Sequence, residues 1–204
     1  GRWYAMPGEG GLLMCTWPRG GAEKAAGKGE PGFVAYFNEC MTGFEYQVAA
    51  HMIWEGLVEQ GLAVTRMIHD RYHASKRNPW NEVECSSHYA RAMASYGVFL
   101  AACGFEYDGP KGHLGFAPRM TPDDFRAAFT TAEGWGTFSQ KSEGGGLKAE
   151  VSVKWGRLRL KELTLELGDA RPVGRMSVTV GGKTVQARLQ RDAKRLGIQL
   201  GSGV

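Results

Sequence analysis

The chain has 204 residues, of which 43% are hydrophobic and 23% are charged, and its formal net charge is +4. A chain of this composition can bury a core, which excludes an intrinsically disordered tail. It contains no apolar run near the roughly 20 residues of a membrane-spanning helix, and its first residues do not form a signal peptide.

The charge is unevenly distributed along the chain. From Leu147 onward there are 12 Lys and Arg residues and 5 Asp and Glu residues, so that part has a net charge of +7 and the first 146 residues have −3. A basic end half is compatible with binding to nucleic acid or to an anionic surface. Because these charges alternate with apolar residues, we favour the solvent-exposed side of a sheet and expect no nucleic-acid partner.

Four cysteines, Cys15, Cys40, Cys85 and Cys103, are far apart and form no C-x-x-C pair. This spacing argues against a structural zinc site and against a disulfide scaffold. The five histidines form no H-E-x-x-H motif and no metal cluster. We therefore expect reduced thiols, no metal and a cytoplasmic location.

Helices are predicted over about residues 42–130, after a glycine-rich segment with little regular structure. Thr42 and Glu45 have the spacing of a capping box, which predicts a helix that begins near Gly43 and ends at Gly61. A second helix over residues 62–72 should run antiparallel to it because the link is short. A third helix is predicted over about residues 87–103, with Gly104 at its end.

The remaining elements follow from a change of hydrophobic period. Thr121-Pro122-Asp123-Asp124 has the residues of a helix start and predicts a short fourth helix through Phe129. Beyond Gly134 apolar residues recur at every second position, as Val151, Val153 and Trp155 do. Residues 147–204 are therefore predicted to form an antiparallel sheet of four or five strands, with a hairpin at Gly181-Gly182-Lys183.

The third predicted helix contains one charged side chain in apolar surroundings. Between Tyr89 and Cys103 only Arg91 is charged. A guanidinium cannot lose its proton to escape burial, so it needs a carboxylate or a polar ligand beside it. If the helix extends upstream, Glu84 and His88 lie on the face of Arg91, and Glu82 can reach the same pocket from the preceding loop.

Two interpretations of this cluster remain open from the residues alone. A buried Arg–Glu pair can simply stabilise the entry to a helix, since ion-pair networks often resemble sites. Alternatively, the carboxylates and Arg91 are fork-shaped partners for vicinal hydroxyls, and aromatic faces such as Trp80 and Tyr89 can cover the apolar side of a sugar ring. The second interpretation predicts a sugar site rather than a phosphate site.

Three segments form a long, ordered match to a known family: residues 37–49 (FNECMTGFEYQVA), 77–85 (RNPWNEVEC) and 88–96 (HYARAMASY). Shorter segments fit as well, at residues 15–18, 107–110, 115–118 and 134–136. Over residues 1–140 the chain resembles the C-terminal region of glycoside hydrolase family 116. This is the family of non-lysosomal glucosylceramidases and bacterial β-glucosidases.

The resemblance implies a fold, an activity and a set of roles. It implies a mainly α fold: the last helices of an (α/α)6 toroid in residues 1–140, followed by an antiparallel β-meander in residues 147–204. It also implies hydrolysis of β-glucosides with retention of configuration and without a metal or organic cofactor. Glu82 and Arg91 match family residues that hold the glucose hydroxyls, and Glu84, His88 and Trp80 are expected to support them.

The catalytic carboxylates are missing from the match. Retaining hydrolysis needs two carboxyl groups about 5 to 5.5 Å apart, and in the family both lie upstream of the segment that this chain resembles. We therefore assign no catalytic residue here. We expect a C-terminal fragment of a longer enzyme that is inactive alone and whose partners are a β-glucoside and the missing N-terminal part.

Two other functions remain as alternatives. The chain can be a non-catalytic protein that binds a carbohydrate or a protein partner. A weaker alternative is association with nucleic acid or a membrane through the basic sheet, which should weaken at physiological salt. For the enzyme, we expect membrane contact only through a lipid substrate.

Overall fold

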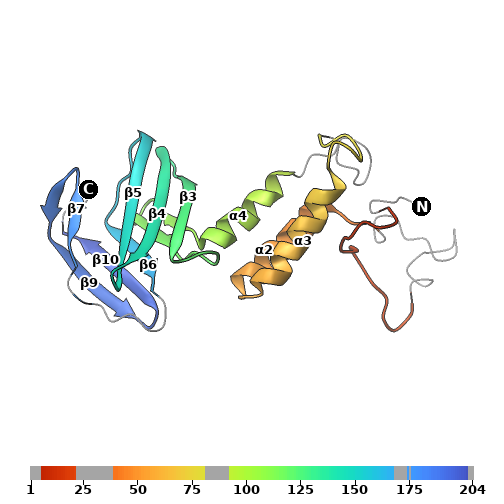
Figure 1. Ribbon diagram of the computed structural model, residues 1–204, viewed down its shortest axis with the longest axis horizontal. Helices are drawn as coiled ribbons and strands as arrows, with labels where there is room; N and C mark the ends of the chain where they lie inside the picture. Colours follow the sequence, from red (N-terminus) through yellow and green to blue (C-terminus); the bar gives the residue numbers. More distant parts are fainter. Residues whose placement is uncertain (1–5, 22–38, 81–91, 168–173, 175, 202–204) are drawn as a thin grey trace. The chain divides into compact units, whose positions relative to one another are not determined.

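The computed structural model describes residues 6–21, 39–80, 92–167, 174 and 176–201. The chain divides into two compact units, residues 1–101 and 102–204, and each is described by itself (Figure 1). The predicted domains, residues 1–140 and 147–204, stay a prediction.

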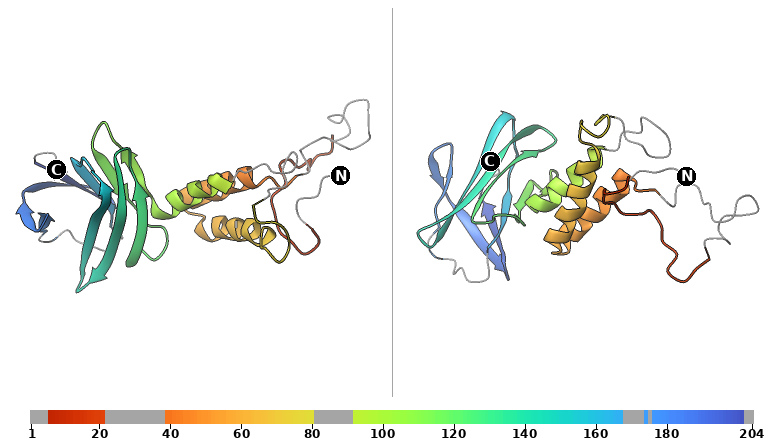
Figure 2. Two further views of the ribbon diagram at one scale, coloured as in Figure 1. Left: turned by 90° about the horizontal axis from the view of Figure 1, so that it is seen from above. Right: turned by 45° about the vertical axis from the view of Figure 1, so that its right-hand side comes forward.

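Helices make up most of the regular structure of the first unit. They are α2 (Thr42–Trp54), α3 (Val58–Arg71), the short 3-10 helix η1 (Ala92–Ala94) and α4 (Ser95–Cys103), whose last residues belong to the second unit. Helices α2 and α3 lie side by side (Figures 1 and 2). Their apolar faces and the start of α4 enclose a small core of Ala49, Ile53, Val64, Ile68, Val98 and Ala101.

The start of α2 confirms the predicted helix but not its predicted cap. The helix begins at Thr42, after the N-cap residue Met41, and no side chain caps it. The Thr42 hydroxyl is buried without a hydrogen-bond partner among the described residues. The capping-box interpretation was wrong because the Glu45 carboxylate is turned toward Arg71 and Leu12 instead of the helix start.

The end of α2 lies earlier than predicted, at Gly56 rather than Gly61. Gly56 has φ +86°, and the N–H groups of Gly56 and Leu57 donate to the carbonyl oxygens of Ile53 and Met52. This is the Schellman arrangement, in which a left-handed glycine satisfies the last carbonyls of a helix. Gly61 lies inside α3, so the prediction that it ends a helix was wrong.

Ten strands are described in the second unit, in three sheets. They are β1 (Glu106–Asp108), β2 (His113–Phe116), β3 (Asp124–Thr130), β4 (Gly134–Glu143), β5 (Gly146–Gly156), β6 (Glu162–Glu166), β7 (Val178–Val180), β8 (Lys183–Val185), β9 (Ala187–Asp192) and β10 (Arg195–Leu200). The five-stranded sheet has the order β1-β2-β6-β10-β9, and the three-stranded sheet has the order β3-β4-β5. Strands β7 and β8 form a separate hairpin.

The two larger sheets pack face to face (Figures 1 and 2). Phe116 of β2 stacks on Phe138 of β4 with the ring centroids 3.8 Å apart, and it meets Phe129 of β3 edge to face. Leu114, Leu165, Leu196 and Ile198 line the inner side of the five-stranded sheet and are buried. The core of this unit is therefore a β-sandwich core, and each sheet turns its other face outward.

The prediction of a mainly α fold with a partial (α/α)6 toroid and a β-meander was wrong. Among the described residues 36% lie in strands and 24% in helices, so the protein is mainly β. The C-terminal strands do not form a simple meander either, because β6 pairs in parallel with β2 and inserts between β2 and β10. Strands begin at Glu106, inside the segment that was predicted to be helical.

The predicted fourth helix is strand β3. Its buried residues, Phe125, Ala127 and Phe129, alternate with exposed ones, and the strand pairs along its length with β4. This period of two outweighs the helix-start signal at Thr121, whose φ of +42° belongs to a turn.

Two other local predictions are confirmed. Gly104, with φ +55°, follows the end of α4. Gly181 and Gly182, both with positive φ, join β7 to β8 in a two-residue hairpin turn. In the described parts of the chain, the helices are too short or too polar to cross a bilayer.

Candidate functional site

Among the described residues, the first unit contains one fully buried arginine side chain, that of Arg71. Arg71 is the last residue of α3 and its side chain is 0% exposed. It follows Val64 and Ile68 at helical spacing, so it lies on the face of α3 that packs against α2. The packing of this face takes the guanidinium out of water.

Glu45 of α2 neutralises this charge. The Arg71 Nη1 group donates to Glu45 Oε1 at 3.0 Å, and Nη2 donates to Glu45 Oε2. Glu45 Oε1 also accepts the Leu12 backbone N–H at 2.7 Å. Both carboxylate oxygens are therefore satisfied by protein groups, as a buried ion pair requires.

The ion pair also holds the segment that precedes α2. Arg71 Nη1 donates to the Gly10 carbonyl at 2.9 Å. A Cβ atom at Gly11 would lie 2.8 Å from Arg71 Nη1 and 2.7 Å from Cys40 Sγ, so only glycine fits there without a shift. The close approach of this backbone to the guanidinium is thus built into the sequence.

Local electrostatics match a structural role for the pair. Burial opposes the charged guanidinium, but the hydrogen bonds and the charge of Glu45 outweigh it and raise the pKa of Arg71. Burial, together with the charge of Glu45, raises the pKa of the neighbouring Cys40 thiol. Neither group is prepared for proton transfer or nucleophilic attack near neutral pH.

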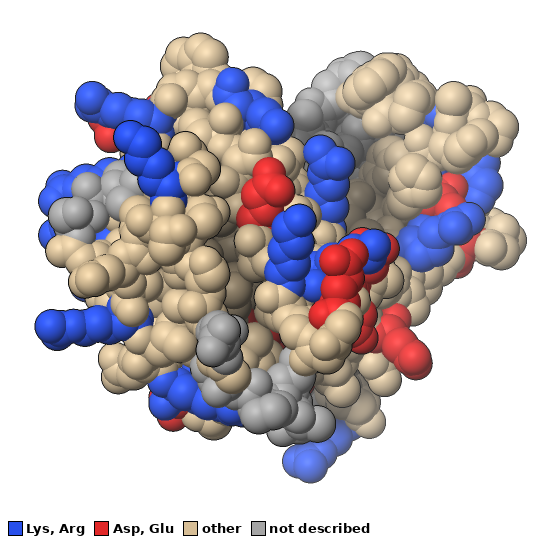
Figure 3. All heavy atoms as spheres, turned by 60° about the vertical axis from the view of Figure 1, so that its left-hand side comes forward, with Lys and Arg blue, Asp and Glu red and all other residues tan. Residues whose placement is uncertain are grey.

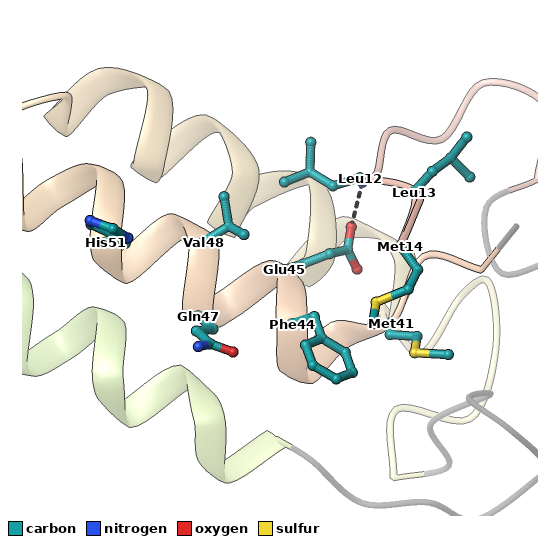
Figure 4. Close-up of a pocket in the computed structure, with 9 residues that line it drawn as sticks. All are labelled: Leu12, Leu13, Met14, Met41, Phe44, Glu45, Gln47, Val48 and His51. Atoms are coloured by element: carbon teal, nitrogen blue, oxygen red, sulfur yellow. Dashed lines mark hydrogen bonds between the residues drawn. The ribbon is translucent and has the colours of Figure 1, made fainter. Parts of the chain in front are cut away.

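A pocket of about 330 Å³ lies beside this pair (Figure 4). Most of its lining is apolar, and three polar side chains take part; the residues are Leu12, Leu13, Met14, Met41, Phe44, Glu45, Gln47, Val48 and His51. Its volume is in the range of small-molecule sites. Because Glu45 already has its partners, only Gln47 and His51 are left to direct a polar ligand, and the pocket suits an apolar group best.

Most of the predicted sugar-site residues lie outside the described residues. These are Glu82, Glu84, His88 and Arg91. Trp80 is described, and its side chain is 88% exposed. The backbone N–H of Trp80 donates to Asn78 Oδ1 at 3.0 Å, which forms a turn at the end of this described part of the chain.

The chain that leads to Trp80 is anchored by a second ion pair. Arg77 Nη2 donates to both oxygens of Glu9, at 2.8 and 2.7 Å. The guanidinium also lies 5.9 Å from the centre of the Tyr72 ring. Glu9 and Arg77 thus connect the start of the described chain to the turn after α3.

The sequence contained a signal for Arg71 and Glu45 that was not used. Arg71 continues the apolar stripe of Val64 and Ile68, which marks it as a charge on a buried face. Because Glu45 was assigned to the helix cap, it was not considered as the buried ion-pair partner of an arginine. Among the described residues no cluster of His, Cys, Asp and Glu is suited to hold a metal ion.

Comparison with protein-family models finds no match to this chain, and comparison with curated proteins finds none either.

Proposed function

We propose that the chain is the C-terminal part of a retaining β-glucosidase or glucosylceramidase. In this proposal Glu82 and Arg91 hold the hydroxyls of the glucose, and Glu84, His88 and Trp80 support them. The proposal is based on the ordered resemblance of residues 37–49, 77–85 and 88–96 to glycoside hydrolase family 116.

The observation that carries the proposal furthest is the exposed Trp80. An indole that is 88% exposed is unusual in a folded chain, and its apolar face is suited to cover a sugar ring. Trp80 lies two residues before Glu82, and the Arg77–Glu9 ion pair fixes the turn that carries it. An aromatic face and a fork-shaped acid close together in the sequence are the elements that a pyranose site needs.

The proposed role is binding and orientation rather than bond cleavage. Retaining hydrolysis requires a nucleophile and an acid/base on opposite sides of the glycosidic bond. We assign neither to this chain, so both come from the missing N-terminal part of the enzyme. The spacing of the cysteines favours a cytoplasmic enzyme. In this proposal the enzyme contacts a membrane only when it binds a lipid substrate such as glucosylceramide.

The test uses the full-length enzyme and aryl β-glucosides. Arg91→Ala and Glu82→Gln should each lower kcat/KM by about a hundredfold or more, because each removes charge-assisted hydrogen bonds to the sugar. Arg66→Ala, which removes an exposed side chain of α3, is the matched control and should leave the kinetics unchanged. Unchanged kinetics in a correctly folded Arg91 or Glu82 variant would remove that residue from the site.

The coding DNA upstream of Gly1 separates the enzyme from the alternative. An open reading frame that encodes a catalytic Glu and Asp supports the proposal. A stop codon followed by a start codon next to Gly1 supports a non-catalytic carbohydrate- or partner-binding protein instead.

A further inference from the structure

The outer face of the β3–β4–β5 sheet carries two exposed tryptophans. Trp135 of β4 is 50% exposed and Trp155 of β5 is 65% exposed. The two residues are direct partners in the antiparallel ladder. Directly opposed residues point to the same side of a sheet, with Cβ atoms about 4.5–5.5 Å apart. The two exposed indoles therefore lie on the same side of the sheet, and we call this pair of side chains the tryptophan platform.

A β-bulge creates this platform. The register moves by one residue between Trp135 and Gly136, so that Gly136 is opposite Val153 and Trp135 is opposite Trp155. Val153 lies with the inner-facing residues, and the extra residue Lys154 moves Trp155 to the other face. Without the bulge the alternation of β5 would turn Trp155 inward.

The ends of the two strands are held in place around the tryptophans. The Arg157 N–H donates to the Glu133 carbonyl at 3.1 Å, and the Arg157 side chain pairs with the Glu133 carboxylate. Gly156, with φ +74°, and Gly134 let the two backbones approach closely at this point. The platform is therefore built on an ordered strand end, which lowers the entropy that a ligand must remove.

Apart from Lys154 in the bulge and the Glu133–Arg157 ion pair at the strand ends, the ladder residues next to the platform are uncharged. In the ladder, Thr130 of β3 is opposite Trp135, and the adjacent row on the same face consists of Ala128, Thr137 and Ser152. Charged residues begin in the next rows, where Arg126 and Glu150 flank Ser139. Hydroxyl groups next to aromatic faces suit a neutral ligand with many hydroxyls.

A nucleic acid fits this surface less well than a sugar does. Stacking of bases on aromatic side chains is accompanied by a basic groove that follows the phosphates. Lys154 in the bulge directly precedes Trp155, but Lys141 and Lys148 lie three rows from the tryptophans, and Arg157 is paired with Glu133. Figure 3 shows one face of the molecule, on which Lys and Arg side chains are interspersed with Asp and Glu and with uncharged residues.

We propose that the tryptophan platform binds a β-linked glucan chain. Pyranose rings with equatorial substituents have apolar faces that stack on indole rings, and equatorial linkages keep successive rings in one flat ribbon. A flat ribbon matches two indoles on the same side of one sheet, with Thr130, Thr137 and Ser152 as hydrogen-bonding neighbours. This site is separate from the proposed glucose site, because it uses neither Glu82 nor Arg91.

The test measures binding of cellohexaose to the full chain by calorimetry and by tryptophan fluorescence. Trp135→Ala and Trp155→Ala should each weaken binding by about tenfold, and the double variant should abolish it. Trp54→Ala is the matched control, because Trp54 is an exposed tryptophan of α2, and it should bind as the original chain does. Trp155→Tyr, which keeps an aromatic face, should retain most of the affinity if Trp155→Ala loses its fold.

Several results would overturn the proposal. One is that the chain does not bind cellohexaose at millimolar concentration. Another is that correctly folded alanine variants bind cellohexaose as tightly as the original chain does. Equal affinity for maltohexaose, a coiled α-linked chain, would refute the choice of a flat glucan. Tighter binding of single-stranded poly(U) would assign the platform to nucleic acid. The proposed function is tested separately, by measuring whether platform variants of the full-length enzyme still hydrolyse small aryl glucosides.

Discussion

Arg71 and Glu45 show how one charged residue can organise its surroundings. The guanidinium replaces hydration at Nη1 and Nη2 with the Glu45 carboxylate and the Gly10 carbonyl, whereas its buried Nε has no hydrogen-bond partner among the described residues. Each partner is more than 25 positions away along the chain. A solvation requirement at one residue thus determines the position of α2, α3 and the segment before them.

Removal of the buried charge should be strongly destabilising. Arg71→Met leaves the Glu45 carboxylate buried without its counter-charge, and we expect a loss of about 3–5 kcal/mol in the free energy of unfolding. The matched control is Arg66→Met in the same helix, where Arg66 forms an exposed ion pair with Asp70. Urea unfolding of the two variants should show a large loss only for Arg71, and equal losses would contradict the structural role.

The described thiols should differ in reactivity. Burial raises the pKa of Cys103 to about 11 and also raises that of Cys40, whereas Cys15 is partly exposed. Since the thiolate is the reactive form, iodoacetamide at pH 8 should label Cys15 first in the native chain. Peptide mass spectrometry reads each site, and the differences should disappear in urea. Rapid native labelling of Cys103 would contradict its burial.

At the scale of elements, the α2–α3 pair depends on two glycines with different tasks. Gly56 ends α2 through its left-handed conformation. Gly61 lies where the helices approach most closely, and a Cβ atom there would be 2.6 Å from the Ala49 carbonyl oxygen and 2.7 Å from Ile53 Cγ1. The sequence marks both as helix-breaking residues, and only the packing distinguishes them.

Gly61→Ala should therefore destabilise the chain although alanine favours helices. Its helix propensity would add about 1 kcal/mol of stability, but overpacking against α2 costs about 1–3 kcal/mol. Gln60→Ala, at an exposed neighbouring position of α3, should be neutral or slightly stabilising. Thermal unfolding of both variants gives the comparison. A higher melting temperature for Gly61→Ala would show that the helices are not in close contact.

At the scale of the whole molecule, ion pairs lower the pKa of carboxyl groups in both units. The pKa of several carboxyl groups lies below the ordinary value; they are Glu9, Asp70, Asp108, Glu133 and Glu143. For Glu9 burial acts against this, but the Met6 N–H and Arg77 outweigh it. In the other four the main cause is a side-chain hydrogen bond from Arg66, Lys111, Arg157 or Lys141.

These directions predict destabilisation by acid. A carboxylate with a lowered folded pKa stabilises the protein above its unfolded pKa of about 4, and this contribution is lost as the pH falls through the folded pKa. The melting temperature should thus fall below about pH 4. Glu9→Gln, at the best-buried of these groups, should reduce this pH dependence more than Glu143→Gln does, because Glu143 is exposed. An unchanged profile in Glu9→Gln would show that its ion pair does not form in solution.

Short-range features of the fold could be predicted because they depend on a few adjacent residues. The glycine after α4 and the hairpin at Gly181 and Gly182 follow from backbone conformations that only certain residues adopt. The fourth helix was predicted wrongly because a helix-start signal of four residues was preferred to the alternation of Phe125, Ala127 and Phe129. The sheet content was also underestimated because β1 and β2 are short and lack a clear alternation of apolar residues.

The sequence by itself determined that the chain contains a helical and a strand-rich part, and where several turns lie. Only the tertiary structure decided that Arg71 is buried against Glu45, that β6 inserts between β2 and β10, and that Trp155 joins Trp135 on an outer face. The reason is physical. Propensity and capping act over a few residues, whereas the partner of a buried charge and the register of a sheet are chosen by contacts between distant segments when the core closes.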